Sequence, residues 1–386
     1  MSTKPQGELA NLIADIDKKM GEGIATVASK VPRFIHIPTG CFLLDYAMAG
    51  GYAEGCGHMI YGLESCGKTT MSHIACGNLQ KKYPDAHVAW IDTEKKFDPD
   101  WAHKLGMDLD RTVVIKPRTG EHAVDVIEAM ARAMEIKGIV LDSIPSLAPM
   151  KIITKSAEDP TVAERARLVG LLCSKLQQAW IDEAMRGHRF TFFCINQFRE
   201  KVGVMFGDTR TLPGGRFQNY MVDTKLELKA KEVTQNINGQ DRHTANEHSF
   251  KFTKTKGAFS IKSGEFQMVM DDSNRDDGMI TGQFDDYKTI CTFAKRRGFV
   301  TGGGSSWRIA GTEDKFRTLD AIVQHLTTTP ADELKLRRLL IMAQRLDSRL
   351  PALPRDAYLY GTITRKESAD LSKLMIEAGY GRPEQD

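Results

Sequence analysis

Short apolar runs and amphipathic stretches alternate along the first half of the chain. The uninterrupted apolar runs predict strands at 58–61, 88–91, 113–115, 138–141 and 190–195. Apolar positions at helical spacing lie between them, most clearly over 121–136 and 161–186. Continuous apolar strands joined by helices are typical of a parallel sheet with both faces covered. We therefore expect functional side chains where the strands end, at the carboxyl edge of that sheet.

The two ends of the chain follow other patterns. Residues 7–20 place Leu9, Leu12, Ile13 and Ile16 at helical spacing, which predicts an amphipathic helix that packs on its own domain or on a neighbouring subunit. Residues after 196 predict a loop at 199–216, antiparallel strands at 222–229 and 249–270, and helices at 284–298 and 332–349. The predicted organisation is an N-terminal arm over 1–36, an α/β core over 37–275 and a smaller C-terminal α/β domain over 276–386.

Composition narrows the class of protein. A hydrophobic fraction of 41% and a charged fraction of 27% are ordinary for a globular protein, and a net charge of +3 requires any polyanion site to be a local patch. The 7 cysteines form no C-x-x-C pair, which favours a reducing compartment over a disulfide framework or a zinc site. No apolar run reaches the length of about 18 residues that crossing a bilayer needs, so we expect a cytoplasmic protein with no membrane association.

The segment from Gly62 to Thr70 fits the pattern G-x-x-x-x-G-K-[ST] between a predicted strand and a predicted helix. Glycines allow backbone N–H groups to turn around a phosphate, the lysine places a charge on the β/γ oxygens, and the threonine offers a hydroxyl to Mg²⁺. The alternative is a glycine-rich turn with no ligand. The predicted nucleotide contacts are Gly62, Glu64, Ser65, Cys66, Gly67, Lys68, Thr69 and Thr70.

Polar residues at three other strand ends complete a candidate hydrolytic site. Asp142 is positioned to support Mg²⁺ together with Thr69, although a strand-end aspartate could instead cap a helix. Glu94 could polarise the attacking water or could be a surface carboxylate. Asn196 and Gln197 could sense the γ-phosphate and pass that state to the loop beyond.

These segments, taken together, resemble the bacterial RecA recombinases over roughly residues 7–310. The resemblance rests on the phosphate loop at 62–70, Ile91-Asp92-Thr93-Glu94, Val140-Leu141-Asp142-Ser143, Ile195-Asn196-Gln197, and Lys201-Val202-Gly203-Val204-Met205-Phe206-Gly207. The last of these is the most specific, because the family uses it in its second DNA-binding loop. The resemblance implies a RecA-like P-loop NTPase core, a mostly parallel sheet flanked by helices, with an N-terminal polymerisation helix and a small C-terminal α/β domain.

The resemblance also implies a function. Members of the family are ATP- and Mg²⁺-dependent enzymes that polymerise as a helical filament on single-stranded DNA, pair it with homologous duplex DNA and exchange strands. Residue by residue, Lys68 and Glu94 would act in hydrolysis and Gln197 would link the ATP state to DNA affinity. Lys254 and Lys256 would reach the γ-phosphate of the neighbouring subunit, although two lysines on one strand could equally form a solvated face. Single-strand-binding and loader proteins are the implied accessory partners.

Two further sets of residues come from the resemblance. Asp98 and Trp101 match positions that contact adenine, although Trp101 could be a core residue. DNA would bind to a first loop over about 150–165, followed by Arg167, and to a second loop over 198–216. The predicted DNA contacts in the second loop are Arg199, Lys201, Val202, Gly203, Met205, Phe206, Gly207, Arg210, Gly214, Gly215 and Arg216.

The chain also departs from the family pattern. Leu63 and Cys66 replace the usual proline and serine of the phosphate loop, the first DNA loop matches poorly, and the C-terminus lacks the strongly acidic tail of many relatives. The basic helix at 332–349 is interpreted as a surface that gathers duplex DNA, through Arg337, Arg338, Arg345 and Arg349. This divergence favours a phage or otherwise remote member. Two other functions stay open: a hexameric helicase or DNA motor with a RecA fold, and an ATP-gated scaffold that coats DNA without turnover.

Overall fold

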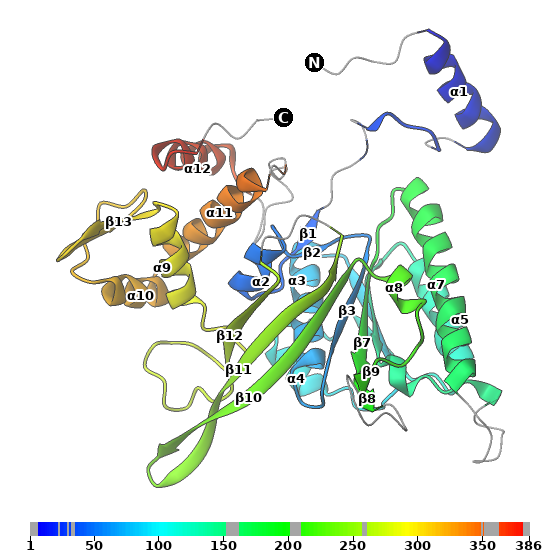
Figure 1. Cartoon of the computed structure of the whole chain (residues 1–386), viewed down its shortest axis with the longest axis horizontal. Helices are drawn as coiled ribbons and strands as arrows, with labels where there is room; N and C mark the ends of the chain where they lie inside the picture. Colours follow the sequence, from blue (N-terminus) through cyan, green and yellow to red (C-terminus); the bar gives the residue numbers. More distant parts are fainter. Residues whose placement is uncertain are drawn as a thin grey trace.

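A single large sheet organises the core of the protein (Figure 1). The computed structural model describes residues 7–21, 24–28, 31, 35–151, 162–200, 210–256, 261–348, 350 and 363–380. The eight strands lie in the order β12-β11-β10-β3-β7-β6-β4-β5. Their bounds are β3 Gly57–Gly62, β4 His87–Asp92, β5 Thr112–Ile115, β6 Ile136–Asp142, β7 Thr191–Gln197, β10 Thr224–Ile237, β11 Gln240–Thr255 and β12 Ser263–Val269. Strands β5 to β10 in this order pair in parallel and β10, β11 and β12 pair antiparallel, so the predicted mostly parallel sheet is confirmed.

Helices cover both faces of this sheet, as the apolar strands predict. Helix α3 (Lys68–Lys82) packs on one face, where its Met71 and Ala75 join a core with Trp90 of β4 and Phe193 of β7. Helices α5 (Gly120–Ala131) and α7 (Val162–Met185) pack on the other face in a second core. The carboxyl ends of β3, β4, β6 and β7 therefore open at one edge between these two layers.

Shorter elements connect the layers. They are β1 (His36–Ile37), α2 (Phe42–Ala47), β2 (Tyr52–Ala53), α4 (Pro99–Lys104), the 3₁₀ turn Ile144–Ser146, β8 (Arg199–Glu200), β9 (Arg210–Thr211) and α8 (Gln218–Met221). Within the described ranges, no helix combines the length and apolar character needed to cross a lipid bilayer.

The antiparallel strands predicted at 222–229 and 249–270 are confirmed, but their bounds were wrong, because β10 continues to Ile237 and β11 already begins at Gln240. Strands β10 and β11 form one long hairpin that turns at Asn238 and Gly239, whose φ angles are 54° and 82°. The outer part of the hairpin is exposed and polar on both faces, so its residues show no alternation of apolar and polar positions. The strands extend away from the body of the protein in Figure 1.

Helix α1 (Glu8–Met20) confirms the amphipathic helix expected near the N-terminus. None of its residues is buried, and Leu9 and Leu12 are each 56% exposed. Figure 1 shows it away from the large sheet. The apolar face of this helix is therefore exposed in the single chain, and its packing on a neighbouring subunit stays a prediction.

The C-terminal part has a core of its own. It consists of α9 (Tyr287–Arg296), β13 (Val300–Gly303), β14 (Ser306–Ile309), α10 (Leu319–Thr328), α11 (Pro330–Asp347) and α12 (Arg365–Glu377). Phe42 and Tyr46 of α2 complete this core, so the module packs directly on the element that precedes the phosphate-binding strand. The domain boundary at 275 stays a prediction.

The interpretation of helix 332–349 as a duplex-binding surface was wrong. Arg337, Arg338 and Arg345 are only 9%, 7% and 6% exposed. Arg337 donates to the buried Asp286 at 3.2 Å, and Nη1 of Arg345 donates to the carbonyl of Ala49 at 2.7 Å. These arginines hold α11 against α9 and α2, because each buried charge requires a local partner; Arg349 lies outside the described residues.

Candidate nucleotide site and DNA interface

The phosphate loop lies between the end of β3 and the start of α3, as the sequence predicts. A Cβ on Gly62 would lie 2.2 Å from the carbonyl oxygen of Leu228, and one on Gly67 would lie 2.8 Å from Cε1 of His248. Gly67 also has a φ of 85°, which favours glycine. The loop is thus pressed against β10 and β11, and only glycine fits at both positions.

Lys68 of this loop makes its contacts within the loop itself. Lys68 is 9% exposed, and its ammonium group donates to the carbonyl of Leu63 and to Sγ of Cys66, the latter at 3.7 Å. A buried ammonium that is satisfied by a loop carbonyl can exchange that partner for a phosphate oxygen. Burial raises the pKa of the Cys66 thiol even beside this lysine.

Thr69 and Asp142 meet at the start of α3. The hydroxyl of Thr69 donates to Oδ2 of Asp142 at 3.1 Å. Burial, together with the negative charge of Glu94, raises the pKa of Asp142 to about 7, against the opposing effects of Thr69 and Lys68. The described residues contain no group of three or more histidine, cysteine or acidic side chains that could hold a metal. One hydroxyl and one carboxylate, at a site with too little positive charge to balance its carboxylates, fit a Mg²⁺ ion that takes its other ligands from phosphates and water.

Glu94 is fixed by two serines that the sequence analysis did not assign. Its Oε1 accepts from Oγ of Ser143 at 2.5 Å and from Oγ of Ser146 at 3.2 Å. The hydroxyl of Thr93 donates to the carbonyl of Asp142 at 2.8 Å, which joins the ends of β4 and β6. Ser143 directly follows Asp142 in the strand-end motif, and this position was the signal from which its role beside the site could have been predicted. The carboxylate that could orient water is therefore held in place.

The end of β7 touches both the phosphate loop and the base of the second DNA loop. Nε2 of Gln197 donates to Oε1 of Glu64 at 2.8 Å. The neighbouring Asn196 is buried, and its Nδ2 donates to Oε1 of Gln218 at 2.7 Å and to the carbonyl of Pro213 at 3.0 Å. Gln218, which connects Asn196 to the base of the second DNA loop, could not be predicted because it belongs to no sequence motif.

The residues matched to adenine contacts lie beside the start of α3. Asp98 caps α4 by accepting from the backbone N–H of Trp101 at 3.1 Å, and the indole N–H of Trp101 donates to the hydroxyl of Thr70 at 3.3 Å. Trp101 is partly buried against the core under α3. The structure thus brings Trp101 next to the phosphate loop, while the adenine contact itself stays a prediction.

Lys254 and Lys256 do not meet the phosphate loop of their own subunit. On β11, Lys254 pairs with Lys225, which pairs with Met59 near the start of β3, whereas Gly62 at its end pairs with Leu228. The two lysines therefore lie toward the edge of the sheet opposite the phosphate loop.

The described part of the second DNA loop forms its base. Strands β8 and β9 place Arg199 opposite Thr211 and Glu200 opposite Arg210, with all four residues exposed. The guanidinium of Arg210 lies 4.7 Å from the ring centre of Phe198. Gly214 and Gly215 have φ angles of 102° and 69°, and Arg167 and Arg216 are exposed. The predicted contacts Lys201, Val202, Gly203, Met205, Phe206 and Gly207 lie outside the described residues, as do residues 152–161 of the first loop predicted over about 150–165.

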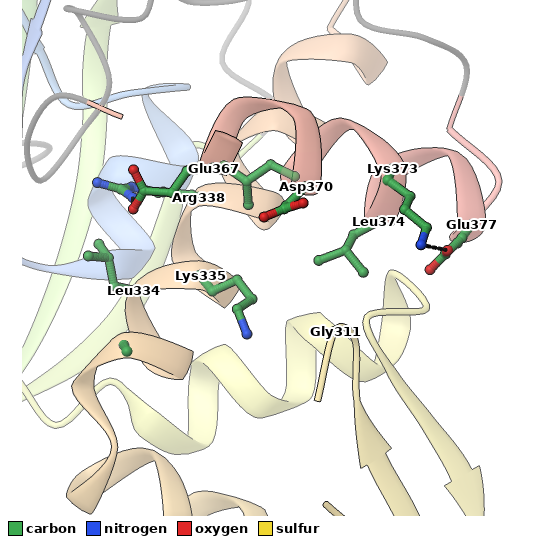
Figure 2. Close-up of a pocket in the computed structure, with 11 residues that line it drawn as sticks. Gly311, Leu334, Lys335, Arg338, Glu367, Asp370, Lys373, Leu374 and Glu377 are labelled. Atoms are coloured by element: carbon green, nitrogen blue, oxygen red, sulfur yellow. Dashed lines mark ion pairs between the residues drawn. The ribbon is translucent and has the colours of Figure 1, made fainter. Parts of the chain in front are cut away.

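A separate cavity of about 500 Å³ lies between α11 and α12 in the C-terminal module (Figure 2). Leu334, Leu371 and Leu374 give it an apolar wall, and charged side chains such as Lys335 and Asp370 surround it. Apart from Arg338, which was assigned to the duplex-binding surface, none of the described residues predicted to bind nucleotide or DNA lines this cavity.

Comparison with known proteins identifies relatives of the core. A family model described as the RecA N-terminal domain matches residues 7–274. The chain is 35% identical to Protein RecA of Oceanobacillus iheyensis over 272 residues, which cover 70% of this chain and 75% of that protein. It is 34% identical to Protein RecA of Streptomyces ambofaciens over 273 residues, 69% of this chain and 70% of the relative. For Protein RecA of Mesomycoplasma hyopneumoniae the identity is 33% over 264 residues, 68% of this chain and 75% of the relative.

Proposed function

The chain belongs to the RecA family of recombinases, and on that premise we propose that it polymerises on single-stranded DNA, pairs it with homologous duplex DNA and exchanges strands. The enzyme is a DNA-dependent ATPase that serves recombination and repair. The observation that carries the proposal is the end of β7, where Gln197 contacts Glu64 of the phosphate loop and Asn196 contacts Gln218 and Pro213 at the base of the DNA loop. A change at the γ-phosphate therefore has a direct route to the loop that holds DNA.

Hydrolysis would use the residues grouped around the start of α3. Lys68 would exchange the carbonyl of Leu63 for a phosphate oxygen. Thr69 and Asp142 would hold Mg²⁺, which when bound neutralises the charge developing on the phosphates. Glu94, oriented by Ser143, would position the attacking water and accept its proton.

Assembly would complete the site. Because Lys254 and Lys256 lie toward the opposite edge of the sheet from their own phosphate loop, they can act only on ATP of another subunit. A lysine supplied by a neighbour would stabilise charge in the transition state, as an arginine finger does. The exposed apolar face of α1 and the exposed Phe217 and Tyr220 near α8, which are 54% and 67% accessible, supply surfaces for contact between subunits.

Single-strand binding would combine cations and apolar faces. Arg199, Arg210 and Arg216 at the base of the loop suit the phosphate backbone, and Met205 and Phe206 suit the bases. Binding of this kind tolerates any sequence, as homologous pairing requires. A cytoplasmic location is also proposed, since the cysteines Cys41, Cys56, Cys66, Cys76, Cys173, Cys194 and Cys291 are all buried and unpaired with one another. Single-strand-binding proteins, loader proteins and a phage origin stay predictions.

Electron microscopy with single-stranded DNA and a non-hydrolysable ATP analogue tests the function, together with a strand-exchange assay using ATP. We expect helical filaments and exchanged strands, and neither with the Lys68→Ala variant, because that variant lacks the charge on the phosphates. Closed rings that unwind duplex DNA would favour the helicase alternative. Filaments that form without ATP turnover or exchange would favour the scaffold.

A further inference from the structure

Both lysines that the proposed function assigns to a neighbouring ATP are bound within their own subunit. Nζ of Lys256 lies 2.7 Å from Oδ1 of Asp223, and this contact holds the pKa of Lys256 above its ordinary value. Nζ of Lys254 donates to the carbonyls of Asn219 and Val222, the latter at 2.5 Å. Residues 219–223 follow the second DNA loop directly, so one short segment engages both ammonium groups.

Asp223 is the fixed member of its pair. Its backbone N–H donates to the carbonyl of Gly57 at 2.7 Å, and its own carbonyl accepts from the N–H of Lys256 at 3.0 Å. The Asp223 side chain is 21% exposed, whereas that of Lys256 is 62% exposed. The carboxylate is therefore built into the sheet edge, while the lysine reaches over it from the surface.

This arrangement sets up a competition. An ammonium group that neutralises Asp223 has less attraction left for a phosphate, so full engagement of a neighbouring γ-phosphate requires Lys256 to leave the carboxylate. The pair is exposed on the lysine side and hence weak, so a triphosphate that carries Mg²⁺ and several charged oxygens can displace it. The contact is strong enough to bias an isolated subunit and weak enough to break on assembly.

We propose that Asp223 is a positioning residue that holds Lys256 within its own subunit and releases it to the ATP of the next subunit. The proposal rests on the proposed function, in which Lys256 acts across the subunit boundary. Asp223 then makes hydrolysis depend more strongly on the assembled, DNA-bound filament. It does so without touching the nucleotide.

The Asp223→Asn variant tests this, because it removes the charge and keeps the shape. At a protein concentration at which subunits contact one another without DNA, we expect DNA-free ATP hydrolysis to rise by up to about fivefold, the most that loss of an exposed ion pair allows. The maximal DNA-stimulated rate stays the same, so the stimulation ratio falls. Asp223→Glu should restore the wild-type ratio. Asp223→Ser removes the same charge and replaces the Asn variant in the test if that variant does not fold.

Two controls separate this effect from a general one. Glu377→Gln removes another exposed carboxylate near a lysine, the Lys373–Glu377 pair at 3.8 Å, and should leave the ratio unchanged. In the double variant Asp223→Asn/Lys256→Ala the DNA-free gain should vanish, because the gain requires the released lysine. A gain that survives in the double variant would overturn the proposal.

The Lys256→Ala variant distinguishes an error about Asp223 from an error in the proposed function. If Lys256→Ala abolishes DNA-stimulated hydrolysis but the folded Asp223→Asn variant keeps the wild-type ratio, Asp223 has no positioning role. If Lys256→Ala keeps full stimulated activity, the role of Lys256 across the boundary is wrong, and the inference falls with it.

Discussion

At the scale of single residues, the carboxylate that we propose as the general base, Glu94, depends on the hydroxyls that orient it. Glu94 follows a buried strand, but its direction comes from Ser143 at 2.5 Å and Ser146 at 3.2 Å. A carboxylate free to rotate would spend less time in line with the attacking water. We therefore expect kcat to fall most when the carboxylate of Glu94 is replaced, and less when Ser143, which makes the shorter contact, is replaced.

Glu94→Gln should lower kcat by about 10²–10⁴-fold, the usual contribution of a general base. Ser143→Ala should lower kcat by roughly tenfold, since it removes one hydrogen bond to a charged group. Both variants should keep nucleotide affinity, because neither side chain lies in the phosphate loop. Steady-state ATPase kinetics on single-stranded DNA measures kcat, and a fluorescent nucleotide measures binding.

Ser146→Ala is the matched control, because its contact with the same oxygen is longer, and its effect should be smaller than that of Ser143→Ala. An unchanged kcat in Ser143→Ala, with Glu94→Gln inactive, would show that the serine does not orient the base. A wild-type kcat in Glu94→Gln would remove Glu94 from the mechanism.

At the scale of elements, the sequence predicted what depends on local pattern. The strands ending at Asp92, Asp142 and Gln197 were predictable because buried parallel strands are continuously apolar and their ends are polar. The outer half of the β10–β11 hairpin could not be predicted, because both of its faces are exposed and its sequence therefore does not alternate between apolar and polar residues. The contacts of Arg337 and Arg345 could not be predicted either. A basic helix has the same sequence pattern whether its charges face DNA or, as here, a buried Asp286 and the carbonyl of Ala49.

Helix α1 carries a prediction of its own. Leu12→Asp places a charge on an apolar face that is exposed in the single chain, where Leu12 is 56% accessible. We expect the melting temperature of dilute protein to shift by less than about 2 °C, because surface substitutions change stability little. Self-assembly should weaken by about tenfold or more, since burying an unpaired charge at an interface is costly. Sedimentation at increasing protein concentration measures the assembly.

Asn11→Asp introduces the same charge at an exposed polar position of the same helix and should assemble like the wild type. If Leu12→Asp assembles as well as Asn11→Asp does, α1 is not the contact between subunits.

At the scale of the whole molecule, the proposed function gives each subunit half of two different ATP sites. The phosphate loop opens at the carboxyl edge of the sheet, and Lys254 and Lys256 lie toward the opposite edge. A polymer that stacks subunits in one direction brings these edges together at every boundary. Because the sheet separates the two parts within a chain, the proposed function makes hydrolysis a property of the assembly.

The sheet also buries histidines that must stay neutral, which makes the stability of the whole molecule sensitive to acid. Burial lowers the pKa of His58, His73 and His248 from 6.5 to about 4 in each case. In the unfolded chain these groups bind protons below pH 6.5, while in the folded protein they do not until about pH 4. Protons therefore favour the unfolded state across this window, and stability falls as the pH is lowered through it.

Each such histidine should contribute on the order of 1–3 kcal/mol to that loss between pH 6.5 and pH 4. His73 is the most useful to change, because both of its ring nitrogens lack a partner among the described residues and its ring packs 4.4 Å from that of Trp90. His73→Leu should leave the melting temperature at pH 7.5 nearly unchanged and flatten its decline toward pH 5. His103→Leu, at an exposed position, should keep the wild-type slope. Equal slopes in the wild type and His73→Leu would mean that this buried imidazole has no part in acid sensitivity.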